Sequence, residues 1–203
     1  CFLDLEDVMP QCFLVKDNMK KAVHKIIITT TEVVVDDKLL DVTCSGSGIL
    51  AELYRKYVND YPKYFKMDIL CKLGFIATEL LLRAEGNARF VPCEDRAVVL
   101  FNRSSSLHAD TSFESTIRNR KSFYPSPAVF VYTLPNIVTG EIAIRNKYYG
   151  ETNFIVTESR DESVVENIID GVLTDDMTTS VITGWLEAES EEKFNAEIYI
   201  IEK

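Results

Sequence analysis

The sequence predicts an α/β domain with a five-stranded mixed sheet and helices on both faces. Strand-like segments rich in β-branched residues alternate with amphipathic helical segments, the order expected of right-handed crossovers onto a mostly parallel sheet. The last two strand segments, 179–187 and 195–202, are joined by a polar stretch too short for a helical crossover, so this pair should be antiparallel. With 203 residues, one domain of ordinary size is the default.

The N-terminal quarter begins with a mixed segment and continues into a strand and a helix. Residues 1–24 are predicted to form an N-terminal extension, and 25–203 the single domain. Residues 25–36 are rich in Val, Ile and Thr, which favours one buried strand. The Gly- and Ser-rich stretch 41–48 predicts a loop, and a helix is expected over 49–58.

The most periodic helix and the most apolar strand follow. Over 67–84, apolar side chains recur at i, i+3 and i+4 and cover one helix face, and Gly86 follows as a stop signal. Residues 96–101 form a continuous apolar run, typical of a strand buried on both faces. The Ser-rich stretch 102–110 is then predicted to be a loop at the carboxyl end of that strand.

The second half of the chain completes the alternation. Pro127 fits the first turn of a helix over 126–147, which Pro135 should kink. The remaining elements are expected as a strand over 153–158, a helix over 163–173, and strands over 179–187 and 195–202.

Composition excludes several classes of function. Apolar residues make up 46% and charged residues 27% of the chain, as in globular proteins. No apolar run approaches the roughly 20 residues of a membrane helix, and no basic segment followed by an apolar stretch marks a secretory signal, so no membrane association is expected. The net charge of −10 argues against a nucleic-acid partner.

The cysteines indicate reduced thiols rather than cross-links. The five cysteines are odd in number and lack paired CxxC spacing, so neither a disulfide framework nor a zinc site is expected. Buried, reduced thiols in a cytoplasmic protein are the interpretation, and no cofactor or metal is expected. These cysteines are Cys1, Cys12, Cys44, Cys71 and Cys93.

The most specific pattern lies in residues 126–159. An apolar helix with an Asn-Ile pair and small residues runs to Tyr-Tyr-Gly at 148–150, and a short buried strand ends on Thr-Glu-Ser at 157–159. This layout resembles the approach to the nucleophile in β-ketoacyl synthases (3-oxoacyl-acyl carrier protein synthases). In that family the helix runs into a Gly-Pro turn, and the strand ends on an Ala-Cys pair whose Cys takes the acyl chain. Here Gly150-Glu151 stands at the turn, and Glu158-Ser159 stands where Ala-Cys should be.

The resemblance covers about 25–203 and implies a half-thiolase-like layered fold, equivalent to the N-terminal half of the thiolase fold. Supporting stretches are 61–75, the Ser run 104–106, and the closing segments 171–187 and 196–202. In condensing enzymes a second half supplies the His pair, or His and Asn, that handles the malonyl group. This chain has two histidines, His24 and His108, and neither matches a position of the family motif.

Ser159 and Glu158 are the candidate catalytic residues, at a nucleophile position that has degenerated. Ser159 needs an adjacent base, no histidine lies near it in sequence, and a neighbouring carboxylate disfavours an alkoxide. A capping role is the alternative for Ser159. Glu158 resembles the Gln that replaces the Cys in chain-length partners of type II polyketide synthases, where it mimics an acylated Cys and carries no chain. An exposed strand end is the alternative for Glu158.

Basic residues provide candidates for a contact with an acyl carrier protein. An acidic carrier or its phosphopantetheine phosphate would be attracted to a local basic patch, although a solvated basic face is the alternative. The candidates are Arg118, Arg120, Lys121, Arg145 and Lys147. His108 and Asp110 follow the Ser run too closely to form a catalytic triad and are expected in a polar loop. The glycosylation sequon that begins at Asn102 is interpreted as chance.

The resemblance therefore implies an accessory, non-condensing subunit of a carrier-protein-dependent fatty acid or polyketide-type pathway. Its expected partner is a second copy or a ketosynthase, with an acyl carrier protein as a further candidate. Half of a two-half fold leaves an apolar face, so association through 126–147 and 153–158 is expected. Two alternatives stay open: an active synthase or acyltransferase that uses Ser159 or a partner's residues, and a non-enzymatic scaffold that retains the fold.

Overall fold

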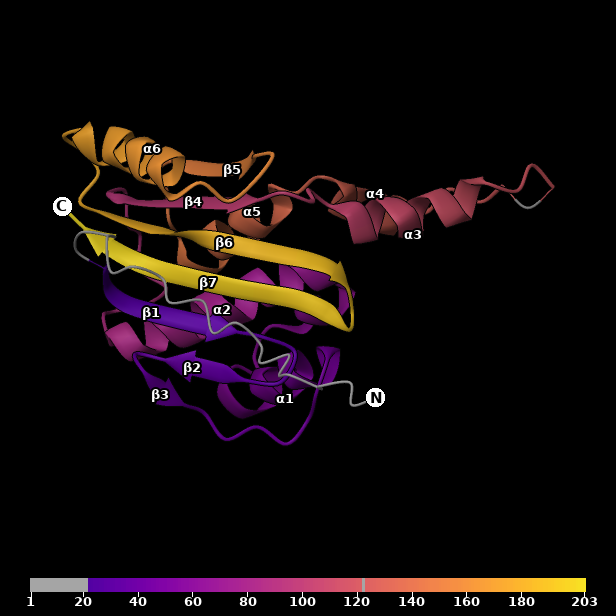
Figure 1. Ribbon diagram of the computed structural model, residues 1–203, viewed down its shortest axis with the longest axis horizontal. Helices are drawn as coiled ribbons and strands as arrows, with labels where there is room; N and C mark the ends of the chain where they lie inside the picture. Colours follow the sequence, from indigo (N-terminus) through magenta and orange to yellow (C-terminus); the bar gives the residue numbers. More distant parts are fainter. Residues whose placement is uncertain (1–21, 122) are drawn as a thin grey trace, which may run out of the picture.

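The structure, a computed structural model, describes residues 22–121 and 123–203. One mixed sheet in the order β3-β2-β1-β7-β6-β4-β5 runs through the molecule, with helices on both faces (Figure 1). In chain order the strands are β1 (Ala22–Ile28), β2 (Val33–Val35), β3 (Lys38–Leu39), β4 (Arg96–Asn102), β5 (Thr152–Val156), β6 (Ser180–Ser190) and β7 (Lys193–Glu202). The α-helices are α1 (Ser47–Tyr57), α2 (Ile69–Glu85), α3 (Leu107–Ile117), α4 (Pro127–Phe130), α5 (Ile137–Asn146) and α6 (Glu162–Thr174), and the 3-10 helices are η1 (Pro62–Lys66) and η2 (Val131–Thr133).

The mixed α/β class is confirmed, and so is the antiparallel pairing of the last two strands, β6 and β7. The strand count is wrong, because the sheet has seven strands and not five. The expectation of a mostly parallel sheet is also wrong. The parallel pairs are β4 with β5 and β4 with β6, whereas the other four pairings in the sheet are antiparallel.

The extra strands arise because the stretch 25–36 folds into a hairpin instead of one strand. The Thr29 hydroxyl accepts hydrogen bonds from the backbone N–H groups of Thr31 and Glu32, and this closes a turn that contains neither Gly nor Pro. A second turn follows at Asp36 and Asp37, both with positive φ, and leads into β3. β1 begins at Ala22, inside the expected extension, and residues 1–21 of that extension lie outside the described part of the chain.

The larger core lies on the sheet face that α1, α2 and α5 cover. Even-numbered residues of four adjacent strands point to this face, among them Ile26, Val98, Ile182 and Ile198. α2 packs against β1, β6 and β7 and also against α1 and α5, which explains why it is buried nearly all round. The expected helix over 67–84 is thus confirmed. It begins after the N-cap Asp68 and ends at Gly86, which adopts the left-handed conformation with φ 75°.

A smaller core lies on the opposite face, under α6. Val165, Ile169 and Val172 of α6 pack over odd-numbered strand residues such as Val99 and Trp185. β4 contributes to both cores, so all seven of its residues are buried. Burial on both faces is the physical reason for its unbroken apolar sequence.

Two predictions about helices are wrong in the region that follows β4. The expected loop 102–110 is shorter, because α3 begins at Leu107, directly after its N-cap Ser106. Ala109 is the buried residue of this helix. The expected helix over 126–147 is divided into α4, η2 and α5. The kink expected at Pro135 is confirmed, because the chain bends by 96° at the break that contains this residue. We call residues 107–121 and 123–134 the arm. Figure 1 shows the arm extending beyond the end of the sheet.

Within the part of the chain that the structure describes, no single helix has the length and apolar character needed to cross a membrane. One bent pair, 127–133 with 137–146, meets that test by length and composition together.

Candidate functional site

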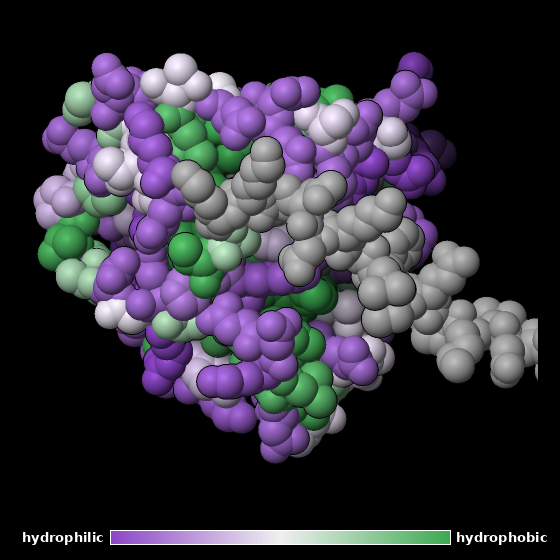
Figure 2. All heavy atoms as spheres, turned by 60° about the vertical axis from the view of Figure 1, so that its left-hand side comes forward, coloured by the Kyte–Doolittle hydropathy of each residue, from purple (hydrophilic) through white to green (hydrophobic). Residues whose placement is uncertain are grey.

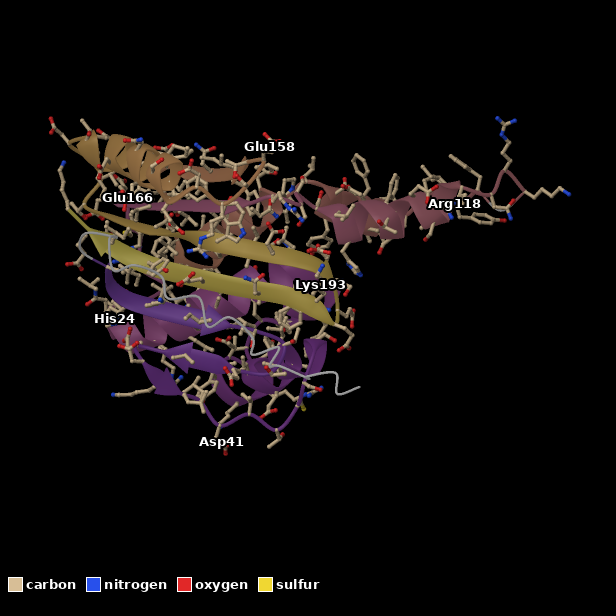
Figure 3. The ribbon with its side chains drawn as sticks, viewed as in Figure 1. His24, Asp41, Arg118, Glu158, Glu166 and Lys193 are labelled. Atoms are coloured by element: carbon tan, nitrogen blue, oxygen red, sulfur yellow. The ribbon has the colours of Figure 1, made fainter. Side chains whose placement is uncertain are left out.

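Glu158 and Ser159 lie in the loop between β5 and α6, two and three residues after the end of β5. They line an open cleft of ≈ 380 Å³ over the sheet face that α6 partly covers. Figure 3 shows Glu158 on the outer side of the molecule near the end of β5. The cleft is also lined by Arg103, Arg160, Trp185, Glu187, Lys193 and Asn195. The position expected for the nucleophile is therefore at a cleft, at the carboxyl end of a parallel strand.

The loop after β4 forms one wall of this cleft and is fixed by side-chain hydrogen bonds. The Glu187 carboxylate accepts hydrogen bonds from the Arg103 backbone N–H (2.6 Å) and from the Ser104 hydroxyl. The Asn102 amide accepts from the backbone N–H of Ser105 (3.0 Å) and donates to its carbonyl (2.8 Å). Because Asn102 is fully buried, the sequon that begins there is inaccessible to glycosylation.

Arg160 fixes the loop that carries Glu158 and Ser159. Its Nη1 lies 2.7 Å from Oε2 of Glu197 on β7, and its Nε lies 2.5 Å from Oε1 of Glu162 at the start of α6. Lys25 Nζ lies 2.9 Å from the second carboxylate oxygen of Glu197. Burial alone would raise the pKa of Glu197, but hydrogen bonds from Tyr199 and Lys25 and the charge of Arg160 lower it instead. Glu197 is therefore a buried carboxylate that is held in its charged form and anchors the loop.

Ser159 is exposed in this loop, and its backbone carbonyl accepts a hydrogen bond from the Thr157 hydroxyl (3.0 Å). Among the described residues, no hydrogen bond joins the Ser159 hydroxyl to a basic side chain. Glu158 is likewise exposed. A serine nucleophile needs a base within hydrogen-bonding reach and donors for an oxyanion. As it stands, the cleft can bind polar or charged groups but lacks a paired base for Ser159 among these residues.

Neither histidine lies at this cleft. His24 is on β1, and its Nδ1 lies 2.7 Å from Oδ2 of Asp36, so the pair links β1 to the turn after β2 (Figure 3). His108 is on α3 and lines a different cleft, together with residues of α2 and α4. Asp110 accepts from the Ser106 hydroxyl (3.3 Å), as an N-terminal residue of α3.

The basic candidates fall into two groups that the structure does not bring together. Arg118, Arg120 and Lys121 are exposed at the tip of the arm, where Figure 3 labels Arg118. Arg145 and Lys147 lie at the end of α5, which packs against α2. The Arg145 side chain is only 11% exposed. Its Nη2 lies 2.5 Å from Oδ1 of Asp60.

Arg145 is further enclosed by neighbouring rings and a buried acid. Its guanidinium lies 5.2 Å from the ring centroid of Tyr61 and 4.6 Å from that of Phe90. Its Nε lies 3.5 Å from Oε1 of Glu79, which is buried and also pairs with Arg89. These contacts occupy the guanidinium inside the molecule, whereas Lys147 is exposed.

The apolar residues of the two segments expected to contact a partner, 126–147 and 153–158, are likewise partly covered by the molecule and partly exposed. Ile142 is buried, and Ile137 and Phe154 pack against the larger core, so the molecule itself covers them. Four others are exposed: Val131 (43%), Leu134 (49%), Ile144 (68%) and Val156 (46%). The arm adds Leu107, Phe123, Tyr124 and Phe130 to the exposed set. The face in Figure 2, by contrast, is mainly hydrophilic, with separate smaller hydrophobic patches.

The cysteines are not all buried as expected. Cys71 is buried in α2, and burial raises the pKa of its thiol. Cys44 is exposed and Cys93 is half-buried, and all three are free thiols. Cys1 and Cys12 lie outside the described residues. Among residues 22–121 and 123–203, no group of three or more His, Cys, Asp or Glu side chains is placed to hold a metal ion.

Sequence reasoning missed the role of the residues that fix the loops of this cleft, namely Arg160, Glu187, Glu197 and Lys25. A usable signal was present, because Lys25 and Glu197 stand within apolar strand sequences. Charged residues in such strands are buried only with partners, so they indicate an ion pair between the two strands. Arg160, the loop residue that pairs with Glu197, directly follows Ser159, but it belongs to no periodic pattern in the sequence.

No protein-family model matches the chain, and no curated protein matches it. Solved structures, in contrast, do match the chain. The ishigamide ketosynthase/chain length factor aligns with a TM-score of 0.66 at 16% identity, over 90% of this chain and 62% of that chain. A ketosynthase in complex with its chain length factor from Xenorhabdus doucetiae aligns with a TM-score of 0.58 at 12% identity, over 90% of this chain and 79% of that chain.

These likenesses are structural, because the sequence identities are far too low to carry function. The chain spans less than two thirds of the length of the ishigamide structure that it matches. The fold of residues 22–203 is nevertheless that of ketosynthase and chain length factor structures, in agreement with the expected thiolase-like layered fold.

Proposed function

We propose that this chain is a non-condensing, ketosynthase-like accessory subunit of a carrier-protein-dependent pathway of the polyketide or fatty acid type. One observation supports the proposal: the fold is similar to ketosynthase structures, and the residues that follow β5, which we take as the strand equivalent to the one before the nucleophile, are Glu158 and Ser159 instead of a cysteine. The absence of a base paired with Ser159 among the described residues supports a subunit that does not itself take up the acyl chain.

The partner that this fold supports best is a ketosynthase, because the similar structures pair a ketosynthase with a chain length factor. β5 is an edge strand of the sheet and so has one unpaired backbone edge. Val156 of β5 itself is exposed, and so is Ile144 of α5, the helix that contacts β5. An edge strand flanked by exposed apolar side chains is a surface that another subunit covers. A second copy of this chain is the alternative occupant of the same surface.

An acyl carrier protein is proposed to contact the arm tip rather than α5. Arg118, Arg120 and Lys121 are exposed there and form a local basic patch on a chain of net charge −10. Lys147 is a further exposed candidate, whereas internal contacts hold Arg145. The free thiols, including the exposed Cys44, fit the cytoplasm, where such thiols stay reduced.

The proposal is tested by purifying the tagged chain from its source organism and identifying what accompanies it. The expected result is a ketosynthase that stays bound through gel filtration. Val156→Asp, at an exposed position, should release that ketosynthase without lowering the melting temperature. Phe154→Asp is the matched control, since Phe154 packs on the core and its substitution should unfold the chain.

Catalysis is then tested on the purified complex with an acyl group loaded on a carrier protein. Intact-mass measurement should find the acyl adduct on the ketosynthase and none on this chain. An adduct on this chain that disappears in Ser159→Ala would establish the active acyltransferase instead. A folded monomer that binds neither a ketosynthase nor a carrier protein would refute the proposal and favour the hypothesis of a non-enzymatic scaffold.

A further inference from the structure

A second and larger cleft, of ≈ 660 Å³, lies between the start of α2, the start of α3 and the α4–η2 segment of the arm. Figure 1 shows these elements meeting where the arm leaves the body of the molecule. This cleft shares no lining residue with the cleft at Glu158 and Ser159. Its volume is in the range of pockets that bind small molecules.

The walls of this cleft are apolar. They include Met67 and Ile69 at the start of α2, Ala109 of α3, and Val129 and Tyr132 of the arm. Met67, Ile69, Ala109 and Tyr132 belong to the buried core, so the wall is continuous with the packed interior. Within the arm, α3 and α4 contact each other through the rings of Phe113 and Phe130, whose centroids are 5.2 Å apart.

The rim of the cleft is cationic, although the chain as a whole is acidic. Lys63, Lys66 and Lys72 line it. Lys63 pairs with Glu141, but among the described residues no carboxylate lies within 4.0 Å of Lys66 or Lys72 in an ion pair. Both ammonium groups can therefore pair with an anion, and the charge of Lys72 also acts on the Asp68 carboxyl.

The two acidic side chains of the same cleft each accept a hydrogen bond from a neutral donor, and Oδ2 of Asp68 is buried without a hydrogen-bond partner among the described residues. Oδ1 of Asp68 accepts a hydrogen bond from the Cys71 N–H (3.0 Å) as the N-cap of α2. Oε2 of Glu191 accepts from the Ser47 hydroxyl (2.8 Å). Lys66 and Lys72 are thus the rim groups that attract a negative group beside the apolar walls.

We propose that this cleft binds an amphipathic anion, an aliphatic chain that carries a carboxylate at one end. The chain would lie on the apolar wall formed by α2 and the arm, and the carboxylate would lie on the side of Lys66 and Lys72. A purely polar anion would leave the apolar walls in contact with water, and an uncharged chain would leave the two ammonium groups unused. This inference does not rest on the proposed function, because it uses neither Glu158 and Ser159 nor a partner subunit.

The test compares ligands that differ in one group only. Dodecanoate, dodecan-1-ol and dodecylammonium are titrated into the full chain, with binding followed by calorimetry. Dodecanoate should bind about fivefold tighter than the alcohol, from two ion pairs at a partly exposed rim, and dodecylammonium should bind more weakly than either. Equal affinities for the acid and the alcohol, or no binding of dodecanoate, would overturn the proposal.

Variants locate the site. The double variant Lys66→Gln/Lys72→Gln should abolish the preference for dodecanoate over dodecan-1-ol. Lys38→Gln removes an exposed charge on β3, which does not line this cleft, and should leave that preference unchanged. Ala128→Trp, at an exposed position of the lining, should fill the cleft and weaken both ligands together. Unchanged binding in Ala128→Trp, with a normal melting curve, would place the ligand elsewhere and refute the assignment.

Discussion

Replacing Arg160 by Gln should destabilise the protein by about 2 kcal/mol at pH 7. The change removes the charge from a side chain that is 29% exposed and leaves Glu197, 9% exposed, with Lys25 as its remaining cation. A hydrogen bond to a charged group contributes about 1.5–3 kcal/mol, and breaking a fully buried pair costs about 3–5 kcal/mol. The lower range applies because Lys25 stays 2.9 Å from Glu197 and partly compensates its charge.

The same substitution has a predictable dependence on pH. The folded-state pKa of Glu197 is lowered, so its stabilising contribution is present above the unfolded pKa of about 4.3 and is lost as the pH falls through the folded value. Once Glu197 is protonated, Arg160 has no charge to pair with on β7. The penalty of Arg160→Gln should therefore be constant near neutrality and should shrink below about pH 4.

Urea unfolding followed by the fluorescence of Trp185 measures this effect. Trp185 is the single tryptophan, is 7% exposed and lines the same cleft as Arg160. With a slope of about 2 kcal/mol/M, the midpoint should fall by about 1 M. Arg118→Gln, which breaks an exposed pair with Glu114, should leave the midpoint unchanged. A shift below about 0.3 M, or one that is the same at pH 7 and in acid, would show that Arg160 does not anchor the loop.

Two further substitutions test local features of the fold. Gly184→Ala should lower the free energy of unfolding by about 2–4 kcal/mol, because the φ of Gly184 is 148° and an added Cβ would overlap the carbonyl oxygen of Glu197. In Gly171→Ala, on α6, the added Cβ meets no atom within 4 Å, so thermal melts should show a neutral or slightly stabilising effect. Asp68→Asn keeps the acceptor for the Cys71 N–H but removes a carboxyl group whose pKa is raised by burial. The melting temperature should therefore rise at neutral pH, and this gain should vanish below about pH 4. A gain in melting temperature that persists in acid would contradict this explanation.

The elements that could be predicted from the sequence are those in which the pattern of apolar residues matches the pattern of burial. β4 is buried on both faces and has an unbroken apolar sequence. α2 is packed on several sides, begins after the N-cap Asp68 and ends at the stop signal Gly86. β6 and β7 are long, apolar and joined by a two-residue turn, which made their antiparallel pairing predictable. In each case the local pattern and the tertiary packing agree.

The elements that could not be predicted are fixed by contacts that leave no periodic pattern. The β1–β2 turn is closed by the Thr29 hydroxyl inside a run of β-branched residues, so propensity alone favours a continuous strand. Ala109 is the one buried residue of α3, and the other residues of this helix are exposed or half-buried, so the sequence shows no clear apolar stripe. The anchoring of the Glu158–Ser159 loop depends on ion pairs between residues about 170 and 37 positions apart in sequence, Lys25 and Arg160 with Glu197, which only the assembled sheet brings together.

The strand order has a consequence for how the molecule is made. β7, the latest of the described strands to leave the ribosome, lies between β1, the earliest, and β6. Until β7 is inserted, the sheet exists as two separate pieces, the β3-β2-β1 meander and the β6-β4-β5 unit, each with an unpaired edge. Closure thus depends on contacts of very large sequence separation, which fold slowly and leave those edges open to wrong pairing. During synthesis the nascent chain should therefore need shielding by a chaperone or by early association with the partner subunit that we propose.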